Sequence, residues 1–131
     1  MRQYGIIAVE AAKKIYELDT KEYEDIWIST CDDLYPGMNK GDKGCPKTTF
    51  IGLCERGYVK GVLGDVSYSV KKNKQYGWEA CNLIKEDETI VNSKTLLWKQ
   101  IMSILGEPIT KKQNSQMDVV VSLYENGLLN I

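Results

Sequence analysis

Apolar side chains recur along most of the chain at intervals of three and four residues, which is the spacing of one face of an α-helix. Near the start of the chain this stripe is formed by Tyr4, Ile7, Ala8, Ala11, Ile15 and Leu18. The stripe predicts a first helix. Either Asp19 or Thr20 can cap a second helix, and Glu22 would complete a capping box with Asp19. This second helix has Trp27 in its stripe and is predicted to stop at Pro36-Gly37.

The same pattern predicts four more helices. The third begins at Pro46, with Phe50, Ile51, Leu53 and Cys54 in its stripe, and the left-handed position after its end suits Gly57. The short stretch YVKGVL then forms either one strand or an extended arm. The remaining three helices run from about Asn73, from a cap at Asn92 or Ser93 to Gly106, and from Ser115, which could share a capping box with Asp118, to Gly127. The fold class is therefore expected to be all-α.

Three blocks of the first half return in the second half in the same order. Tyr4-Gly5-x-x-Ala8 recurs as Tyr76-Gly77-x-x-Ala80, Ile26-Trp27 as Leu97-Trp98, and FIGLCERGYV from Phe50 as VVSLYENGLL from Val120. A repeat of this length indicates an internal duplication, although amphipathic helices also resemble one another through shared periodicity. We expect a single compact domain over residues 1–131, in which residues 1–59 and 73–129 form two three-helix units about a pseudo-twofold axis. Trp27 and Trp98 should then be buried at equivalent positions.

Composition excludes several kinds of chemistry. The chain of 131 residues has 17 Lys and Arg, 18 Asp and Glu, a net charge of −1 and no histidine. Ser-His-Asp and Cys-His catalysis and histidine-based metal sites are therefore excluded. No apolar run approaches the roughly 18 residues of a membrane span. The start of the chain lacks the order of a signal peptide, so we expect a cytoplasmic protein that makes no membrane contact.

The four cysteines are spaced unlike a metal site or a disulfide framework. No CxxC pair is present, so a zinc site would need four scattered thiolates. Cys31, Cys54 and Cys81 fall on apolar helix positions and are expected to be small buried hydrophobic residues in a reducing compartment. Cys45 differs because it lies in a polar loop just before a helix. Its thiol could be activated at the helix start, but the sequence supplies no general base, so we expect no catalytic residues, no metal and no cofactor.

Two stretches carry a resemblance to a known family. GCPKTTFIGLCERGYVKGV, residues 44–62, and NSQMDVVVSLYENGLL, residues 114–129, resemble an uncharacterised family of small bacterial proteins, a domain of unknown function. The resemblance covers most of the chain. It implies no activity, so the function has to be argued from the residues.

Charge is neutral overall but unevenly distributed. Residues 40–74 carry eight basic and three acidic residues, which is typical either of a solvated surface or of a face that binds an anion. Two loops at corresponding places in the repeat, NKGDKGCPK and TKKQNSQ, lead into the third helix of each unit. A helix start offers free N–H groups and a positive dipole end. We therefore predict a ligand-binding set made of Lys43, Cys45, Lys47, Thr48, Lys111, Lys112, Asn114 and Ser115.

This set favours a non-enzymatic module that binds an anionic small molecule, a nucleotide signal or a nucleic-acid backbone. The glycine-rich loop GDKGCPKTT lacks the spacing of a P-loop, so it gives no support to ATP hydrolysis. The alternative is a small regulator that binds a protein partner, for instance in phage–host defence. Such a partner would meet an apolar edge and the acidic second helix, which holds Glu22, Glu24, Asp25, Asp32 and Asp33. These carboxylates would otherwise form a solvated face or bind a divalent cation. The oligomeric state is left open.

Overall fold

The computed structural model describes residues 2–37, 44–65 and 71–131. Within these ranges the fold is all-α, as predicted. Its elements are α1 (Arg2–Leu18), α2 (Tyr23–Leu34), α3 (Gly44–Glu55), α4 (Lys72–Glu86), the 3₁₀ helix η2 (Glu88–Asn92), α5 (Lys94–Ile104) and α6 (Gln116–Glu125). None of the helices in the described ranges is long and apolar enough to cross a membrane.

Some of the predicted helix caps and helix starts agree with the structure, and others do not. Ser93 caps α5, since its hydroxyl accepts the Leu96 N–H at 3.1 Å. The predicted capping box of Asp19 with Glu22 is wrong, because Asp19 has a φ of 50°. The Glu22 N–H instead donates to the Thr20 hydroxyl at 3.1 Å. Helix α3 begins two residues before Pro46, which still lies in the first turn where a missing N–H costs nothing.

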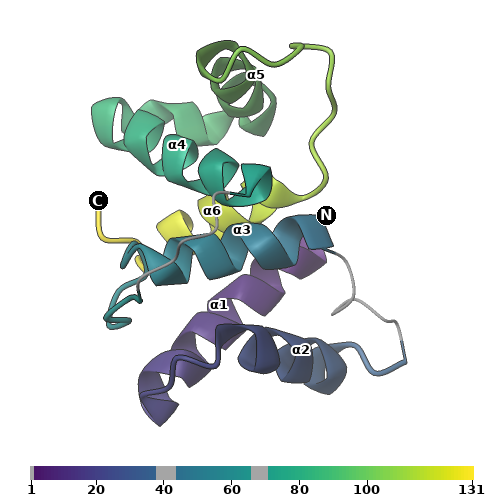
Figure 1. Ribbon diagram of the computed structural model, residues 1–131, viewed down its shortest axis with the longest axis vertical. Helices are drawn as coiled ribbons and strands as arrows, with labels where there is room; N and C mark the ends of the chain where they lie inside the picture. The colour runs from purple at the N-terminus through teal and green to yellow at the C-terminus, as the bar shows by residue number, and fades with distance from the viewer. Residues whose placement is uncertain (1, 38–43, 66–70) are drawn as a thin grey trace.

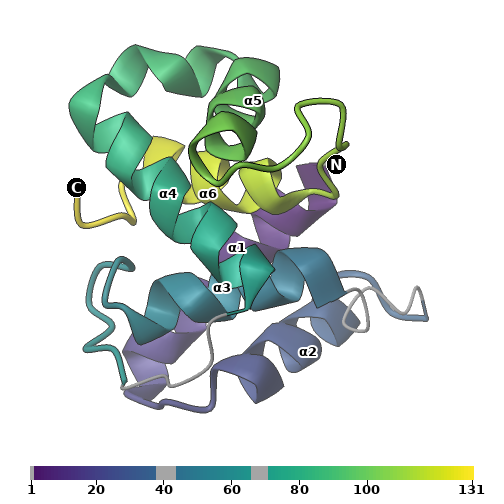
Figure 2. The same ribbon diagram turned by 45° about the horizontal axis from the view of Figure 1, so that its top comes forward.

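The two halves of the chain pack crosswise. The most extensive helix contacts are those of α3 with α4 and of α1 with α6, so the first helix of each half lies against the third helix of the other. Figure 1 shows α2 and α5 at opposite ends of the molecule, with α3 and α6 between them, and Figure 2 shows α4 crossing in front of α6. Glycines permit this close approach. A side chain at Gly5 would overlap Ser122 of α6, and one at Gly77 would come within 3.1 Å of Thr49 of α3.

Corresponding positions of the two halves meet in an antiparallel pairing after α3 and α6. Val59 and Leu129, which are 70 residues apart, form an isolated bridge, and within the described residues the YVKGVL stretch makes no other sheet pairing. Two hydrogen bonds of 2.8 Å flank the bridge, from the Lys60 N–H to the Leu128 carbonyl and from the Asn130 N–H to the Tyr58 carbonyl. Adding 70 to the donor Lys60 gives the other donor, Asn130, and subtracting 70 from the acceptor Leu128 gives the other acceptor, Tyr58. This is the pattern that a pseudo-twofold relation requires, while the superposition of the two units stays a prediction.

The core confirms the predicted burial for most residues of the stripes, whereas Leu18, at the end of α1, is 64% exposed. Trp27 is fully buried and its ring centroid lies 5.1 Å from that of Phe50. Trp98 is 4% exposed and packs edge-on against Tyr76, with centroids 4.9 Å apart. Cys31, Cys54 and Cys81 are buried free thiols, and burial raises the pKa of Cys81 to about 12. The apolar faces of all six α-helices thus join in one core.

Candidate functional site

The start of α3 and the loop before α6, each part of a predicted site loop, come together near the start of α4. The side-chain amide of Asn114 donates to the sulfur of Cys45 at 3.7 Å. Beside this contact, the Gln116 amide donates to the Asn73 side chain at 3.0 Å, and the Thr49 hydroxyl bonds to the Asn73 carbonyl at 3.1 Å. The helix starts therefore lie next to each other, but their polar groups are largely used in binding one another.

The start of α6 is occupied by side chains of its own loop. The Met117 N–H donates to the Gln113 side chain at 3.1 Å. Ser115 has a φ of 70°, is 6% exposed and makes no capping bond, so the predicted capping box with Asp118 is wrong. A capping residue normally has extended backbone, which the left-handed Ser115 lacks. Asp118 instead accepts from Lys94 at 2.8 Å.

The predicted lysines divide into paired and unpaired groups. Lys47 donates to Glu24 at 2.7 Å, and this hydrogen bond and the charge of Lys47 lower the pKa of the Glu24 carboxyl. Lys111 lies 3.1 Å from Glu107. Lys112 is exposed and has no ion pair with any described residue. Lys43 lies outside the described residues. Half of the predicted lysine set is thus already neutralised by carboxylates.

Lys47 and Thr48 line a cleft of about 470 Å³ between the starts of α2, α3 and α4. Four lysines and five carboxylates line this mixed-charge cleft, together with Tyr23, Gly44, Thr48 and Ile51. Its lysines are Lys21, Lys47, Lys71 and Lys74, and its carboxylates are Glu22, Glu24, Asp25, Glu55 and Asp65. Since the two signs nearly cancel, this cleft does not favour a simple anion.

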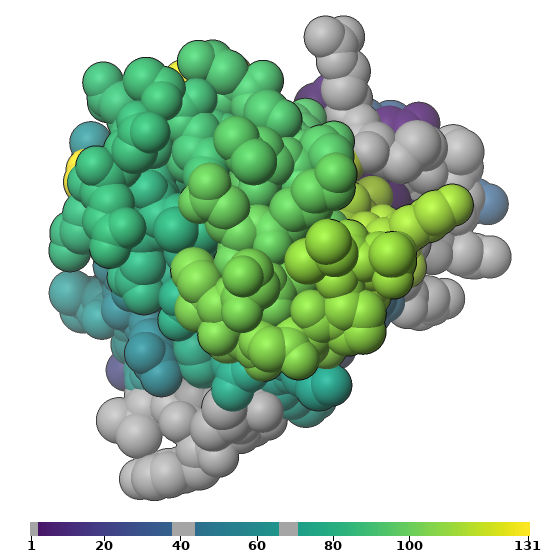
Figure 3. Space-filling view, turned by 90° about the horizontal axis from the view of Figure 1, so that it is seen from above, coloured from purple at the N-terminus to yellow at the C-terminus, as the bar shows by residue number. Residues whose placement is uncertain are grey.

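Lys111 and Lys112 line a second cleft, of about 510 Å³, between α5 and the segment that leads to α6. The described residues that line it include three lysines, Lys99, Lys111 and Lys112, and no carboxylate. Trp98 and Ile109 supply apolar surface, and the remaining lining residues are Thr95, Thr110 and Gln113. The face that α4, α5 and this light-green segment form is seen in Figure 3. We call this hollow the lysine cleft; Asn114, Ser115 and Cys45 line neither of the two clefts.

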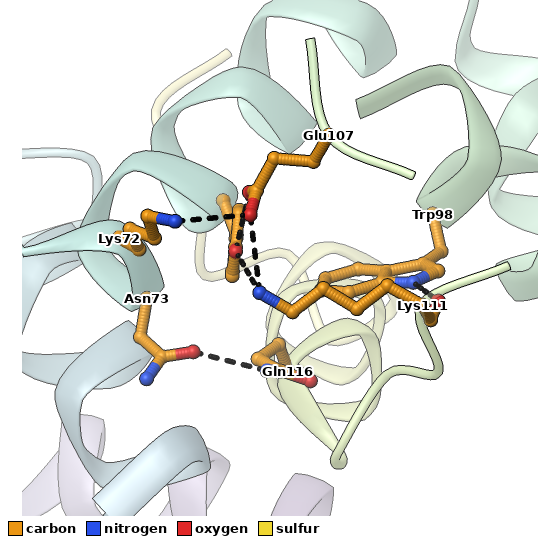
Figure 4. A network of polar contacts seen from close by, with 7 residues as sticks. Lys72, Asn73, Trp98, Glu107, Lys111 and Gln116 are labelled. Atoms are coloured by element: carbon orange, nitrogen blue, oxygen red, sulfur yellow. Dashed lines mark hydrogen bonds and ion pairs between the residues drawn. The ribbon is translucent and has the colours of Figure 1, made fainter. Parts of the chain in front are cut away.

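A polar network supports one wall of the lysine cleft (Figure 4). The buried Tyr76 hydroxyl donates to Glu107 at 2.5 Å and accepts from Lys111 at 2.7 Å, while Lys72 lies 3.2 Å from the same carboxylate. The hydrogen bond from Tyr76, followed by those from Lys111 and Lys72, lowers the pKa of Glu107 to about 2. The Trp98 indole donates to the Lys111 carbonyl at 2.7 Å, so backbone and side chain of Lys111 are both held.

Sequence reasoning missed several of these groups. Tyr76 stands out in the sequence only as part of a repeat block, and nothing near Glu107 except Lys111 four residues later points to an ion pair. Lys99 lies on α5, away from the loops on which the prediction rested. Among the described residues no group of three or more Cys, Asp or Glu is placed to hold a metal ion, so a divalent cation on α2 receives no support.

Comparison with known protein families assigns the chain to one of them. A family model described as Family of unknown function (DUF6979) matches residues 1–130, and the chain therefore belongs to this family. This confirms the resemblance to an uncharacterised domain. No curated protein and no solved structure matches the chain.

Proposed function

We propose that this member of the DUF6979 family binds a small anionic molecule in the lysine cleft and does not transform it. One observation carries the proposal: Lys99, Lys111 and Lys112 line the cleft, and no carboxylate lines it in the part of the chain that the structure describes. Cations that converge on a concave, partly dry surface attract an anion more strongly than the same cations in bulk water.

The charge of the cleft is not cancelled by its surroundings. Lys111 and Lys72 both form ion pairs with Glu107, so one negative charge lies beside two positive charges. Lys99 and Lys112 make no ion pair with any residue in the described ranges. A bound phosphate or carboxylate would meet two unpaired ammonium groups, and the surplus of positive charge would stay after Glu107 is counted.

The cleft also favours an anion that has an apolar part. Ile109 is 59% exposed beside it, and Trp98 contributes to the wall. A volume of about 510 Å³ suits a ligand of mononucleotide size. A nucleic-acid backbone needs a longer track of cations, and Lys47 lies in the other cleft, paired with Glu24. We therefore favour a mononucleotide or a similar small anion over a polymer.

The test is a titration of the full chain with AMP, inorganic phosphate and a short oligonucleotide at low and high salt. Trp98 borders the cleft, so its fluorescence should report occupancy, and calorimetry should give the same affinity. Replacing both Lys99 and Lys112 by alanine should weaken AMP binding by about tenfold or more, because losing about 1.4 kcal/mol lowers affinity tenfold.

A double alanine variant of Lys60 and Lys85, two exposed lysines outside this cleft, is the matched control and should bind AMP as the wild type does. Binding of AMP that is unchanged by the Lys99 and Lys112 replacements, or no binding of any probe to the wild type, would contradict the proposal.

A specific observation also favours the alternative, a surface for a protein partner. Tyr16, Leu18 and Leu63 are 65%, 64% and 90% exposed, and Tyr16 lies against Gly61, so they gather near the end of α1. Large apolar side chains exposed together are typical of interaction surfaces. Replacing Leu18 and Leu63 by serine should abolish a stable complex with a co-purifying protein while leaving AMP binding intact.

A further inference from the structure

The mixed-charge cleft contains unpaired charges of both signs. Lys47 is paired with Glu24 at 2.7 Å, Lys74 with Glu55 at 2.6 Å, and Lys21 lies 3.9 Å from Asp65. These pairs leave one lysine and two carboxylates of the lining without an ion pair to any described residue: Lys71, Glu22 and Asp25. A simple anion or a simple cation would face repulsion from one part of this lining.

Tyr23 is among the residues that line this cleft. Tyr23 is 5% exposed, and its hydroxyl makes no hydrogen bond within the described part of the chain. Burial, followed by the nearby charges of Asp65 and Glu55 among others, raises the pKa of Tyr23 to about 12. The phenol is thus a hydrogen-bond donor at neutral pH. Buried polar groups are satisfied in the great majority of cases, so this exception calls for an explanation.

The floor of the cleft is held rigidly. A side chain at Gly52 would come within 2.7 Å of Lys74, so the stem of Lys74 lies directly on the backbone of α3. This contact fixes the ammonium group against Glu55, and only 7% of the Lys74 side chain is exposed. Because the two charged groups already lie 2.6 Å apart, this pair does not need to form when a ligand arrives.

We propose that the mixed-charge cleft is a second binding site, and that its ligand is a small zwitterion of the amino-acid class. The carboxylate of the ligand would pair with Lys71 and accept the hydrogen bond of Tyr23. Its ammonium group would meet Glu22 and Asp25. A volume of about 470 Å³ is ample for one amino acid and its side chain. This site is independent of the lysine cleft, because no residue lines both.

The experiment screens the full chain against the free amino acids by thermal shift and measures each hit by calorimetry. Sodium acetate and putrescine serve as probes that carry only one sign of charge. We expect at least one amino acid to bind and both single-charge probes to bind at least about tenfold more weakly, the factor that loss of one ionic hydrogen bond produces.

Tyr23→Phe separates ligand binding from folding. It deletes a hydroxyl that has no partner among the described residues, so the variant should melt at the same temperature as the wild type or higher, yet bind the amino acid at least about tenfold more weakly. Tyr124→Phe, which loses a hydroxyl bonded to Glu88 at 2.8 Å on an exposed surface, is the matched control and should bind normally.

Binding of no amino acid to the wild type would overturn the inference. If either Tyr23→Phe or Lys71→Met bound the hit with the same affinity as the wild type, the inference would be overturned as well. The double alanine variant of Lys99 and Lys112 should keep full affinity for the amino acid. Failure of AMP binding would therefore leave this inference standing, and failure of amino-acid binding would leave the lysine cleft untouched.

Discussion

Glu107 joins the end of α5 to α4 and to the segment before α6, and replacing it by glutamine tests whether that network stabilises the fold. The change keeps the shape of the side chain and an acceptor for Tyr76 but removes the charge that Lys72 and Lys111 share. In the folded protein the pKa of Glu107 is lowered from 4.5 to about 2, first by the hydrogen bond from Tyr76. At about 1.4 kcal/mol per pH unit this corresponds to about 3 kcal/mol.

That figure has to be reduced because water screens part of the network. The side chains of Lys72 and Lys111 are 70% and 41% exposed, whereas that of Glu107 is 13% exposed. Exposed ion pairs contribute little, and most of the remaining effect comes from the buried Tyr76 hydroxyl. We therefore expect Glu107→Gln to lower the free energy of unfolding by about 1–2 kcal/mol at neutral pH, the range of a hydrogen bond to a charged group.

The sign of the pH dependence follows from the lowered pKa. A carboxyl whose folded pKa lies below its unfolded value stabilises the fold fully above the unfolded value, here 4.5, and loses this contribution as the pH falls toward about 2. Urea unfolding followed by tryptophan fluorescence should therefore show wild type and variant converging between these pH values. The reasoning would be refuted if the difference in unfolding free energy stayed constant over this range. Glu10→Gln, in an exposed pair with Lys13, is the control and should change little at any pH.

Two other predictions concern packing and thiol reactivity. Gly5→Ala should destabilise the protein by about 1–3 kcal/mol in urea unfolding, because the new methyl group would overlap Ser122 and come within 3.0 Å of the Asp118 carbonyl oxygen. The control is Gly44→Ala, whose methyl group would meet no described atom within 4 Å and should not destabilise the protein. Equal stability of the two variants would contradict the crosswise packing. Native protein should react with a thiol reagent at one cysteine, Cys45, since the other three are buried, and Cys45→Ser should remove this fast phase; a second fast thiol would show that the core opens readily.

The helices could be predicted from the sequence because each depends on a local period of apolar residues. Their caps were less predictable. Asp19 and Ser115 are residue types that commonly cap helices, but both adopt a positive φ, of 50° and 70°. The turn that precedes each helix decides this backbone angle, and packing of the neighbouring elements decides the turn. A capping motif therefore marks where a helix begins more reliably than it describes the hydrogen bonds there.

The predicted site shows a different limit. Lys47 and Lys111 each bond to a group that is distant in the sequence. Glu24 is 23 residues from Lys47, and Tyr76 is 35 from Lys111. Only the tertiary fold brings such groups together, so the count of lysines in a loop overstates the free positive charge. Tyr23 was missed for the related reason that a position in an apolar stripe does not reveal whether its hydroxyl finds a partner.

The predicted relation between the two halves explains why the clefts differ in charge. An offset of 71 residues aligns Trp27 with Trp98, and the same offset aligns Glu24 with Thr95 and Asp25 with Leu96. Glu24 and Asp25 line the mixed-charge cleft beside α2, while Thr95 lines the lysine cleft beside α5. If the halves arose by duplication, equivalent helix starts kept their buried tryptophan, which the core requires, and diverged at exposed positions, where substitution costs little stability. Loss of Glu24 and Asp25 at the equivalent helix start would remove two of the five carboxylates that the described residues give to the mixed-charge cleft, which shifts its charge toward that of the lysine cleft.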